Sequence, residues 1–186
     1  MIFVSDYVKV FPWYMPRYQE GAISLKSVWK GKEGWYIVTM PVTKWLPMRG
    51  GRHLGFPKYI ADAITLTRAS ENWKAQVRHE GLLRLALEFQ PGVAGQLAPW
   101  QKHYLEIETF FHDDIHLLVP PARGPHAQEV RLVHVVPPKS AAVLGKVCIQ
   151  VEQSEPWAGL MPDEIEVPGA CSHFMGGINL VRKDSS

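Results

Sequence analysis

The sequence predicts a mainly β fold in one domain, residues 1–186, with few short helices. Apolar and polar residues alternate along most of the chain with the period of two that is typical of half-buried strands. The alternating segments are short, and glycine, proline and asparagine separate them. About eight short strands in a chain with 46% apolar residues favour a closed antiparallel β-barrel or a sandwich over an α/β fold.

The first predicted hairpin covers residues 22–42, AISLKSVWKGKEGWYIVTMPV. A turn containing glycine is expected at 31–34, between two strands. Residues 35–42 are apolar on both faces. A strand of this kind is expected in the interior of a sheet.

A three-stranded meander follows. Residues 62–68 (DAITLTR) and 73–79 (WKAQVRH) alternate on either side of a turn at 69–72 (ASEN). Residues 82–89 (LLRLALEF) place leucine and phenylalanine on one face, so they form the third strand. Antiparallel pairing is expected throughout this segment.

The second half of the chain carries three more strand candidates at 104–110, 129–136 and 146–152, separated by loops rich in proline. Short helices are expected near 95–102 and 157–161.

Charge and composition exclude several classes of partner. The formal net charge is +2 and no basic run occurs, so we expect no nucleic-acid partner and no membrane surface. No apolar run is long enough to span a bilayer, and the opening residues lack a basic leader, which favours a cytoplasmic protein. Cys148 and Cys171 lack the spacing of a zinc site or a disulfide framework and are expected to be buried free thiols.

Other signals of chemistry are weak. His112 and His116 stand four residues apart with two carboxylates between them, which suits a metal, but a solvated polar loop is the simpler interpretation. Cys171 beside His173 suggests a nucleophile, although an isolated cysteine with apolar neighbours more often packs. No GxSxG motif and no phosphate-binding glycine loop is present, so neither a serine hydrolase nor a nucleotide site is supported. We expect no metal.

Lys58 has unusual neighbours within the segment 49–62, RGGRHLGFPKYIAD. It follows Gly55-Phe56-Pro57 and precedes an ordinary strand. A rigid segment flanked by apolar residues would direct an amine toward the interior, where a lysine is rare without a reason. An exposed lysine on a turn is the alternative, and the residues alone leave both interpretations open.

The same segment resembles the active-site motif of the acetoacetate decarboxylase family, which runs Gly-Arg-Glu, a short spacer, and Gly-Phe-Pro-Lys-Lys. Residues 18–42 are similar to the Tyr-x-Glu stretch and the Gly-x-Tyr strand of the family, which matches Glu20 to its catalytic-site glutamate. Residues 160–181 are similar to its closing segment. The matching motif residues are Gly51, Arg52, Gly55, Phe56, Pro57 and Lys58.

This resemblance implies a closed antiparallel β-barrel of acetoacetate decarboxylase-like type and a homo-oligomer. It implies that Lys58 forms a Schiff base with a small β-keto acid, that CO2 is released, and that Glu20 transfers protons. No metal or organic cofactor is required. Phe56 and Met40 would line the substrate pocket and desolvate the amine.

Three departures from the family pattern affect the chemistry. His53 stands in place of a glutamate, with one residue fewer before the glycine, and Tyr59 replaces the second lysine. The chain also lacks the N-terminal strands and the arginine that they contribute to the substrate carboxylate. Arg52 either replaces that arginine or pairs, as a structural residue, with a backbone carbonyl or a carboxylate.

Since a Schiff base requires a neutral amine and Tyr59 supplies no positive charge, burial is the route left to favour that form. Two alternatives to a decarboxylase remain. The same lysine would serve an aldolase or dehydratase acting on a keto acid, and the fold would also suit a non-catalytic barrel that binds a small ligand.

Overall fold

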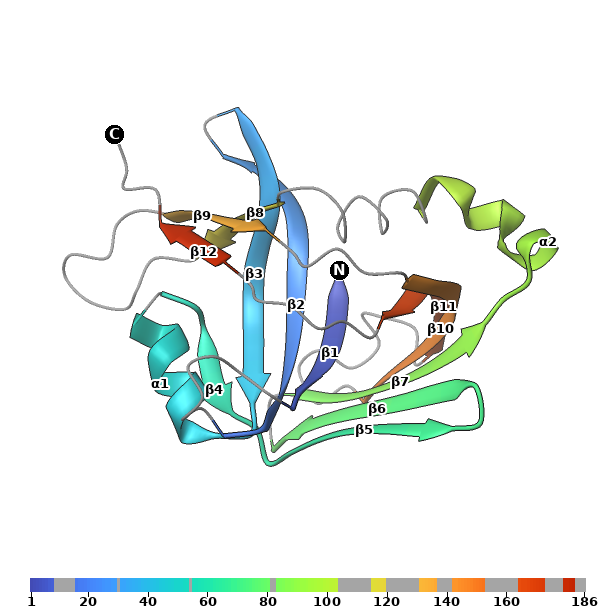
Figure 1. Ribbon diagram of the computed structural model, residues 1–186, viewed down its shortest axis with the longest axis horizontal. Coiled ribbons are helices and arrows are strands. Elements are labelled where there is room, and N and C mark those ends of the chain that lie inside the picture. Colours follow the sequence, from blue (N-terminus) through green and yellow to red (C-terminus); the bar gives the residue numbers. More distant parts are fainter. Residues whose placement is uncertain are drawn as a thin grey trace. The chain divides into compact units, whose positions relative to one another are not determined.

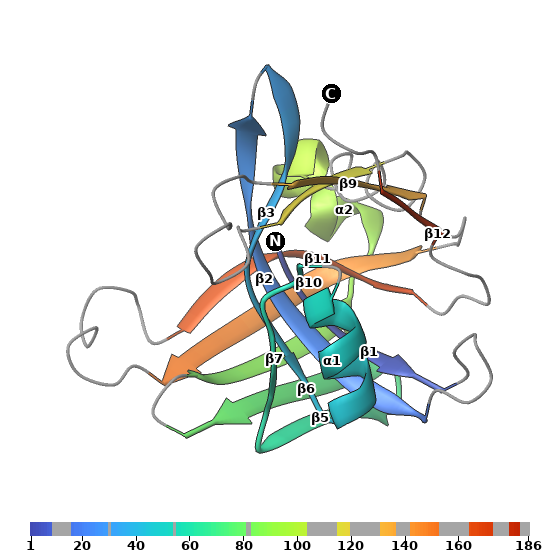
Figure 2. The same ribbon diagram turned by 90° about the vertical axis from the view of Figure 1, so that its left-hand side faces the viewer.

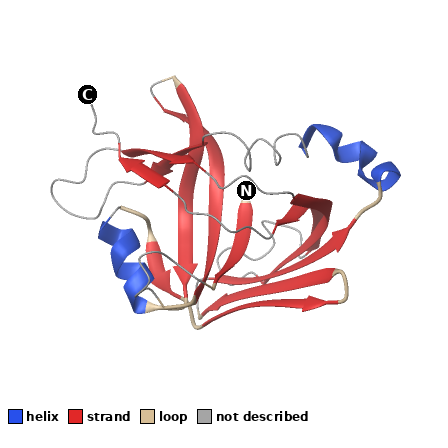
Figure 3. Cartoon of the chain, viewed as in Figure 1, coloured by secondary structure: helices blue, strands red, loops and turns tan. Residues whose placement is uncertain are grey.

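The computed structural model describes residues 1–8, 16–29, 31–53, 55–80, 83–103, 115–119, 131–136, 142–152, 164–172 and 179–182. The chain divides into two compact units, each of which contains one sheet (Figure 1). Unit 1 comprises Met1–Ile60, Asp113–Pro138 and Gly176–Ser186, and unit 2 comprises Ala61–His112 and Lys139–Met175. Strands make up most of the described chain (Figure 3), which confirms the mainly β prediction.

The sheet of unit 1 has the strand order β1-β2-β3-β8-β9-β12, with β4 paired to β3. Because β3 pairs with β2 on one side and with β4 and β8 on the other, it is an interior strand, as its apolar sequence predicts. Its strands are β1 (Ile2–Tyr7), β2 (Tyr18–Trp29), β3 (Lys32–Val42), β4 (Lys58–Ile60), β8 (Ile115–Val119), β9 (Arg131–Val136) and β12 (Asn179–Arg182).

Two pairings in unit 1 are parallel, β3 with β4 and β3 with β8. The prediction of an entirely antiparallel sheet is therefore wrong. Parallel neighbours need a crossover connection, and α1 (Trp45–His53) provides it between β3 and β4. The helix lies beside β4 in both views (Figures 1 and 2).

Helix α1 was not expected from the sequence, because Pro47, Gly50 and Gly51 all disfavour helices. Pro47 is tolerated in the first turn, where its missing N–H has no acceptor within the helix. The chain leaves the helix through Gly55, whose φ of 95° suits glycine and whose N–H donates to the carbonyl of Arg52 at 2.9 Å.

Unit 2 contains an antiparallel sheet of order β11-β10-β7-β6-β5, which confirms the predicted hairpin and meander. The buried apolar residues of its described part include Ala61, Ile64, Ala75, Val77, Leu85, Phe89 and Ile149. The helix expected near 95–102 is present as α2 (Ala94–Leu97) followed by the 3-10 helix η1 (Ala98–Trp100). The strands are β5 (Ala63–Ala69), β6 (Asn72–His79), β7 (Leu83–Pro91), β10 (Ala142–Glu152) and β11 (Glu164–Ser172).

Several expectations are only partly covered by the described residues. Among the described strands, the pairings give two sheets and no closed barrel. The strand expected at 104–110 and the helix at 157–161 lie outside the described residues. The strand expected at 129–136 is β9, and the one at 146–152 is the second half of β10. No helix in the described ranges is long and apolar enough to cross a membrane.

The two cysteines lie on neighbouring strands. Cys148, on β10, is a free thiol that is partly exposed, so the prediction that it is buried is wrong. Cys148 pairs with Glu166 and Glu88 on the neighbouring strands, so it shares the polar face of the sheet with these carboxylates. Cys171 lies on β11, and its side chain is outside the described part of the structure.

Candidate active site

Lys58 is the first residue of β4, at the point where the crossover through α1 returns the chain to the sheet. It lies opposite Met40 of β3 in the parallel pairing. Only 9% of Lys58 is exposed. The structure therefore supports the interpretation that the Gly-Phe-Pro-Lys turn delivers this lysine to the interior of unit 1 rather than to solvent.

Glu20 reaches the same place from β2, 38 residues earlier in the chain. It pairs with Val42 of β3, two residues along that strand from Met40, so the alternation of side chains puts Glu20 and Lys58 on one face. Glu20 is only 4% exposed, and its Oε2 accepts a hydrogen bond from Nζ of Lys58 within an ion pair. The two residues proposed as catalytic are thus in direct contact.

The environment of Glu20 makes it a better proton acceptor than an exposed carboxylate. Burial raises the pKa of Glu20, and the positive charge and hydrogen bond of Lys58 only partly oppose this effect. Taking a charged carboxyl out of water favours its neutral form. The Glu20 carboxylate is therefore placed to accept a proton, in direct contact with Nζ of Lys58.

Two aromatic rings flank the amine. The centroids of the Tyr18 and Phe56 rings each lie 5.9 Å from Nζ of Lys58, within the range of cation–π attraction. Tyr18 stacks in turn on Tyr7, with centroids 4.7 Å apart and an interplanar angle of 14°. Burial and the nearby charge of Glu20 raise the pKa of both tyrosines, so these phenols stay neutral at physiological pH.

Sequence reasoning did not propose Tyr18 as a site residue. A signal was available, because Tyr18 stands two residues before Glu20 on a strand and therefore shares its face. Of the residues expected to line the pocket, Phe56 is 7% exposed and Met40 is 5% exposed. Both lie next to Lys58, Phe56 through its ring and Met40 through the strand pairing.

Arg52 holds the backbone of the lysine. Its Nε donates a hydrogen bond of 2.5 Å to the carbonyl oxygen of Lys58. Of the two roles that the sequence left open for Arg52, this contact matches the structural one, in which Arg52 pairs with a backbone carbonyl. His53, which replaces the family's glutamate, is an exposed residue at the end of α1.

Tyr59 follows Lys58 on β4, so strand alternation directs it to the opposite face. Its phenol forms a hydrogen bond with Thr39, and burial raises the pKa of Tyr59. Tyr59, which stands at the position of the family's second lysine, therefore points away from the face of β4 that carries the amine of Lys58.

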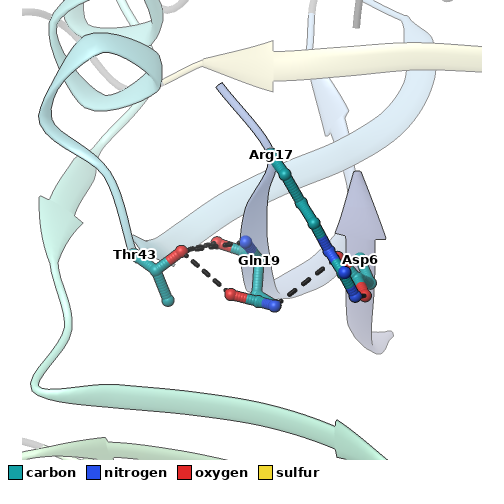
Figure 4. Close-up of polar contacts among 4 residues, drawn as sticks. All are labelled: Asp6, Arg17, Gln19 and Thr43. Carbon is teal, nitrogen blue, oxygen red and sulfur yellow. Dashed lines mark hydrogen bonds and ion pairs between the residues drawn. The ribbon is translucent and has the colours of Figure 1, made fainter. Parts of the chain in front are cut away.

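A polar network supports the strand that carries Glu20 (Figure 4). Nε of Arg17 donates to Oδ1 of Asp6 at 3.1 Å, and Nε2 of Gln19 donates to the same oxygen at 3.5 Å. Oγ1 of Thr43 donates to Oε1 of Gln19 at 3.1 Å, and the backbones of Gln19 and Thr43 are bonded as well. The network links β1, β2 and the end of β3 beside Glu20 and fixes their register.

The described residues contain no group of three or more histidine, cysteine, aspartate or glutamate side chains that could hold a metal ion. Of the histidines considered as ligands, His116 lies on β8, whereas His112 is outside the described residues.

Comparison with known proteins identifies a sequence family. A family profile described as acetoacetate decarboxylase matches residues 2–165. No curated protein matches the chain significantly.

Solved structures share the fold. Acetoacetate decarboxylase from Legionella pneumophila is 17% identical over 86% of this chain and 68% of its own, with a TM-score of 0.53. An acetoacetate decarboxylase-like enzyme from Sphingomonas wittichii RW1 is 17% identical over 90% of this chain and 70% of its own, with a TM-score of 0.52. The enduracididine biosynthesis enzyme MppR in complex with pyruvate is 16% identical over 89% of this chain and 66% of its own, with a TM-score of 0.51.

Proposed function

Because this chain belongs to the acetoacetate decarboxylase family, we propose that it decarboxylates a small β-keto acid through a Schiff base on Lys58. One observation supports this proposal most strongly. Lys58 and Glu20 form a buried pair between two aromatic rings, in which a proton acceptor contacts the amine directly. Perturbed ionisable groups held together in an apolar site are typical of catalytic centres.

Formation of the Schiff base uses Glu20 twice. Glu20 first takes a proton from the Lys58 ammonium, and the neutral Nζ then attacks the ketone carbon of the substrate. The carbinolamine loses its hydroxyl as water when the Glu20 carboxylic acid returns a proton. The product is an iminium cation at Nζ with Glu20 as a carboxylate.

The iminium then drives the loss of CO2. The bond between the α-carbon and the carboxylate breaks, and its electron pair moves into the iminium to give a neutral enamine. Protonation of the enamine carbon and hydrolysis release the ketone and regenerate Lys58. The rings of Tyr18 and Phe56 face the nitrogen that carries the positive charge, so they favour the cationic intermediate.

An aldolase or dehydratase acting on a keto acid is the second candidate, and two observations favour it. Among the described side chains that contact Nζ of Lys58, the charged one is Glu20, and a cationic partner for a substrate carboxylate is not among them. A structural neighbour of comparable similarity, MppR, binds pyruvate. The same enamine would attack an aldehyde instead of taking up a proton.

Two assays on one protein preparation distinguish the candidates. A decarboxylase releases CO2 from acetoacetate at neutral pH, and Lys58→Ala abolishes this release. An aldolase-type enzyme exchanges the methyl protons of pyruvate for deuterium in D2O, because the enamine forms and reverts, and it releases no CO2 from acetoacetate. Absence of both activities in the parent protein would exclude both candidates for these substrates.

A further inference from the structure

Gly51, in the last turn of α1, is buried against the aliphatic part of Lys58. A Cβ atom added to Gly51 would lie 2.6 Å from Cε and 3.1 Å from Cγ of Lys58, and it would also overlap Cδ. Real Cβ atoms essentially never approach other heavy atoms within 3.0 Å. The lysine stem therefore occupies the space that any larger residue at position 51 would need.

The neighbouring Gly50 provides the contrast. A Cβ at Gly50 would meet nothing within 4 Å. Glycine weakens a helix relative to alanine at both positions. Of these two neighbouring glycines, Gly51 is the one whose missing side chain leaves room for the stem of Lys58.

Other contacts of the same helical turn fix the residues around the lysine. The backbone N–H of Phe56 donates to the carbonyl of Gly51 at 2.9 Å. Nε of Arg52 donates to the carbonyl of Lys58 at 2.5 Å. The end of α1 thus holds the backbone of the Phe-Pro-Lys turn on both sides, and the bare backbone of Gly51 supports the side chain between them.

We infer that Gly51 is a positioning residue, whose missing side chain lets the stem of Lys58 lie against α1 and directs Nζ to Glu20 between the rings of Tyr18 and Phe56. The functional part of this inference rests on the proposed role of Lys58 as a nucleophile. A lysine stem is flexible, so a methyl group at position 51 would displace the stem rather than the helix. Nζ would then leave Glu20, and both buried charges would lose their partner.

A double-mutant cycle tests the contact independently of any activity. Gly51→Ala is expected to lower the urea midpoint of unfolding in the parent protein. The loss should disappear in the Lys58→Ala background, where Cγ, Cδ and Cε are gone. Gly50→Ala, the matched control, should lower the midpoint in neither background. If Gly51→Ala does not fold while Gly51→Ala with Lys58→Ala does, the inference is supported. An equal loss in both backgrounds, or failure of both to fold, would overturn it.

The second readout is the pH profile of carbonyl trapping. Acetone and borohydride report the rate at which Lys58 forms a Schiff base. Gly51→Ala should lower this rate about 100-fold at neutral pH, as a misplacement of about 1 Å commonly does. The pH profile should also change shape, because Nζ no longer contacts Glu20, whereas Gly50→Ala changes neither the rate nor the profile.

The double-mutant cycle and the trapping assay distinguish failure of the proposed function from failure of the positioning role of Gly51. If the parent protein traps no acetone, the proposed function fails, and the double-mutant cycle still decides the position of the lysine stem. If the parent protein and Gly51→Ala trap acetone at the same rate with the same pH profile, the positioning role of Gly51 is wrong even though Lys58 is reactive.

Discussion

Glu20 on β2 and Lys58 on β4 lie on the same face of the sheet, on either side of β3. Glu20 pairs with Val42 of β3, and Lys58 pairs with Met40, two residues earlier on the same strand. Strand register therefore brings the two ionisable groups into contact across a distance of 38 residues in the chain. Because β3 is interior and both groups are almost fully buried, the ion pair that they form is shielded from solvent.

The pH dependence of stability should reveal the raised pKa of Glu20. Below the ordinary value of 4.5, the carboxyl is protonated in both states, and its contribution to stability is fully present. As the pH rises through the higher pKa of the folded protein, the unfolded state binds fewer protons and the contribution is lost. The free energy of unfolding of the parent protein, relative to Glu20→Gln, should therefore fall as the pH rises above 4.5.

Urea denaturation at several pH values measures this difference. Glu33→Gln is a suitable control, because the Glu33 side chain is 72% exposed on the same sheet and its replacement should leave the pH slope unchanged. If the free energy of unfolding of the parent protein, relative to Glu20→Gln, rises with pH, the carboxyl is stabilised as an anion and the prediction is wrong.

At neutral pH, Glu20→Gln should also slow acetone trapping about 100-fold or more, because proton transfer is lost.

Arg52→Met should reduce the trapping of acetone and of acetoacetate by similar factors. Arg52 contacts the backbone of Lys58, so its loss affects every substrate of the lysine equally. A loss restricted to acetoacetate, which carries a carboxylate, would instead assign Arg52 to carboxylate binding. Arg49→Met serves as the control on the same helix, since Arg49 is exposed and its guanidinium carbon lies 5.1 Å from the centroid of the Trp45 ring.

Tyr18 should act through its ring and not through its hydroxyl. Tyr18→Phe keeps the ring near Nζ and should trap acetone at the rate of the parent protein. Because the pKa of Tyr18 is raised, its phenol does not ionise near neutrality, and the pH profile should be unchanged. Tyr18→Leu removes the ring and should slow trapping about 2- to 30-fold, the equivalent of a cation–π contact of about 0.5–2 kcal/mol. Equal effects of Phe and Leu would assign the role to the hydroxyl.

The network beside Glu20 should contribute to stability. Gln19→Ala removes the side-chain acceptor of Thr43 and a donor to Asp6, and at about 0.5–1.5 kcal/mol per hydrogen bond it should lower the free energy of unfolding by about 1–3 kcal/mol. Urea denaturation measures the loss. Gln76→Ala, at an exposed glutamine of β6, should cost about 0.5 kcal/mol or less. Equal costs at the two positions would show that the network does not stabilise the strands.

The strands of the meander could be predicted because each alternates over a half-buried sheet and ends at a clear turn signal. Residues 63–69 and 72–79 form this hairpin, and Ser70 adopts the positive φ of 59° that a short turn requires. The interior position of β3 follows equally from its apolar residues. These features depend on local patterns, which a sequence records directly.

Helix α1 and the parallel pairings could not be predicted in the same way. Pro47 and two adjacent glycines read locally as a turn, and tertiary packing overrides that preference: Pro47 and Gly51 are buried, and Gly51 contacts Lys58. Glu20 and Lys58 were assigned to one site from the resemblance, since no local pattern connects residues 38 positions apart. Tyr18 was missed although its position two residues before Glu20 on one strand places both side chains on the same face.

The reactivity of Lys58 is tested most directly by trapping with borohydride. The protein is incubated with acetone, acetoacetate or pyruvate at neutral pH, reduced, and analysed by intact mass and peptide mapping, with Lys58→Ala as the control. A single adduct on Lys58, absent from the variant, is the result expected for an amine activated by burial and by Glu20. Absence of an adduct with all three compounds, at neutral and at raised pH, would contradict a Schiff-base enzyme and favour a protein that binds a small ligand without turnover.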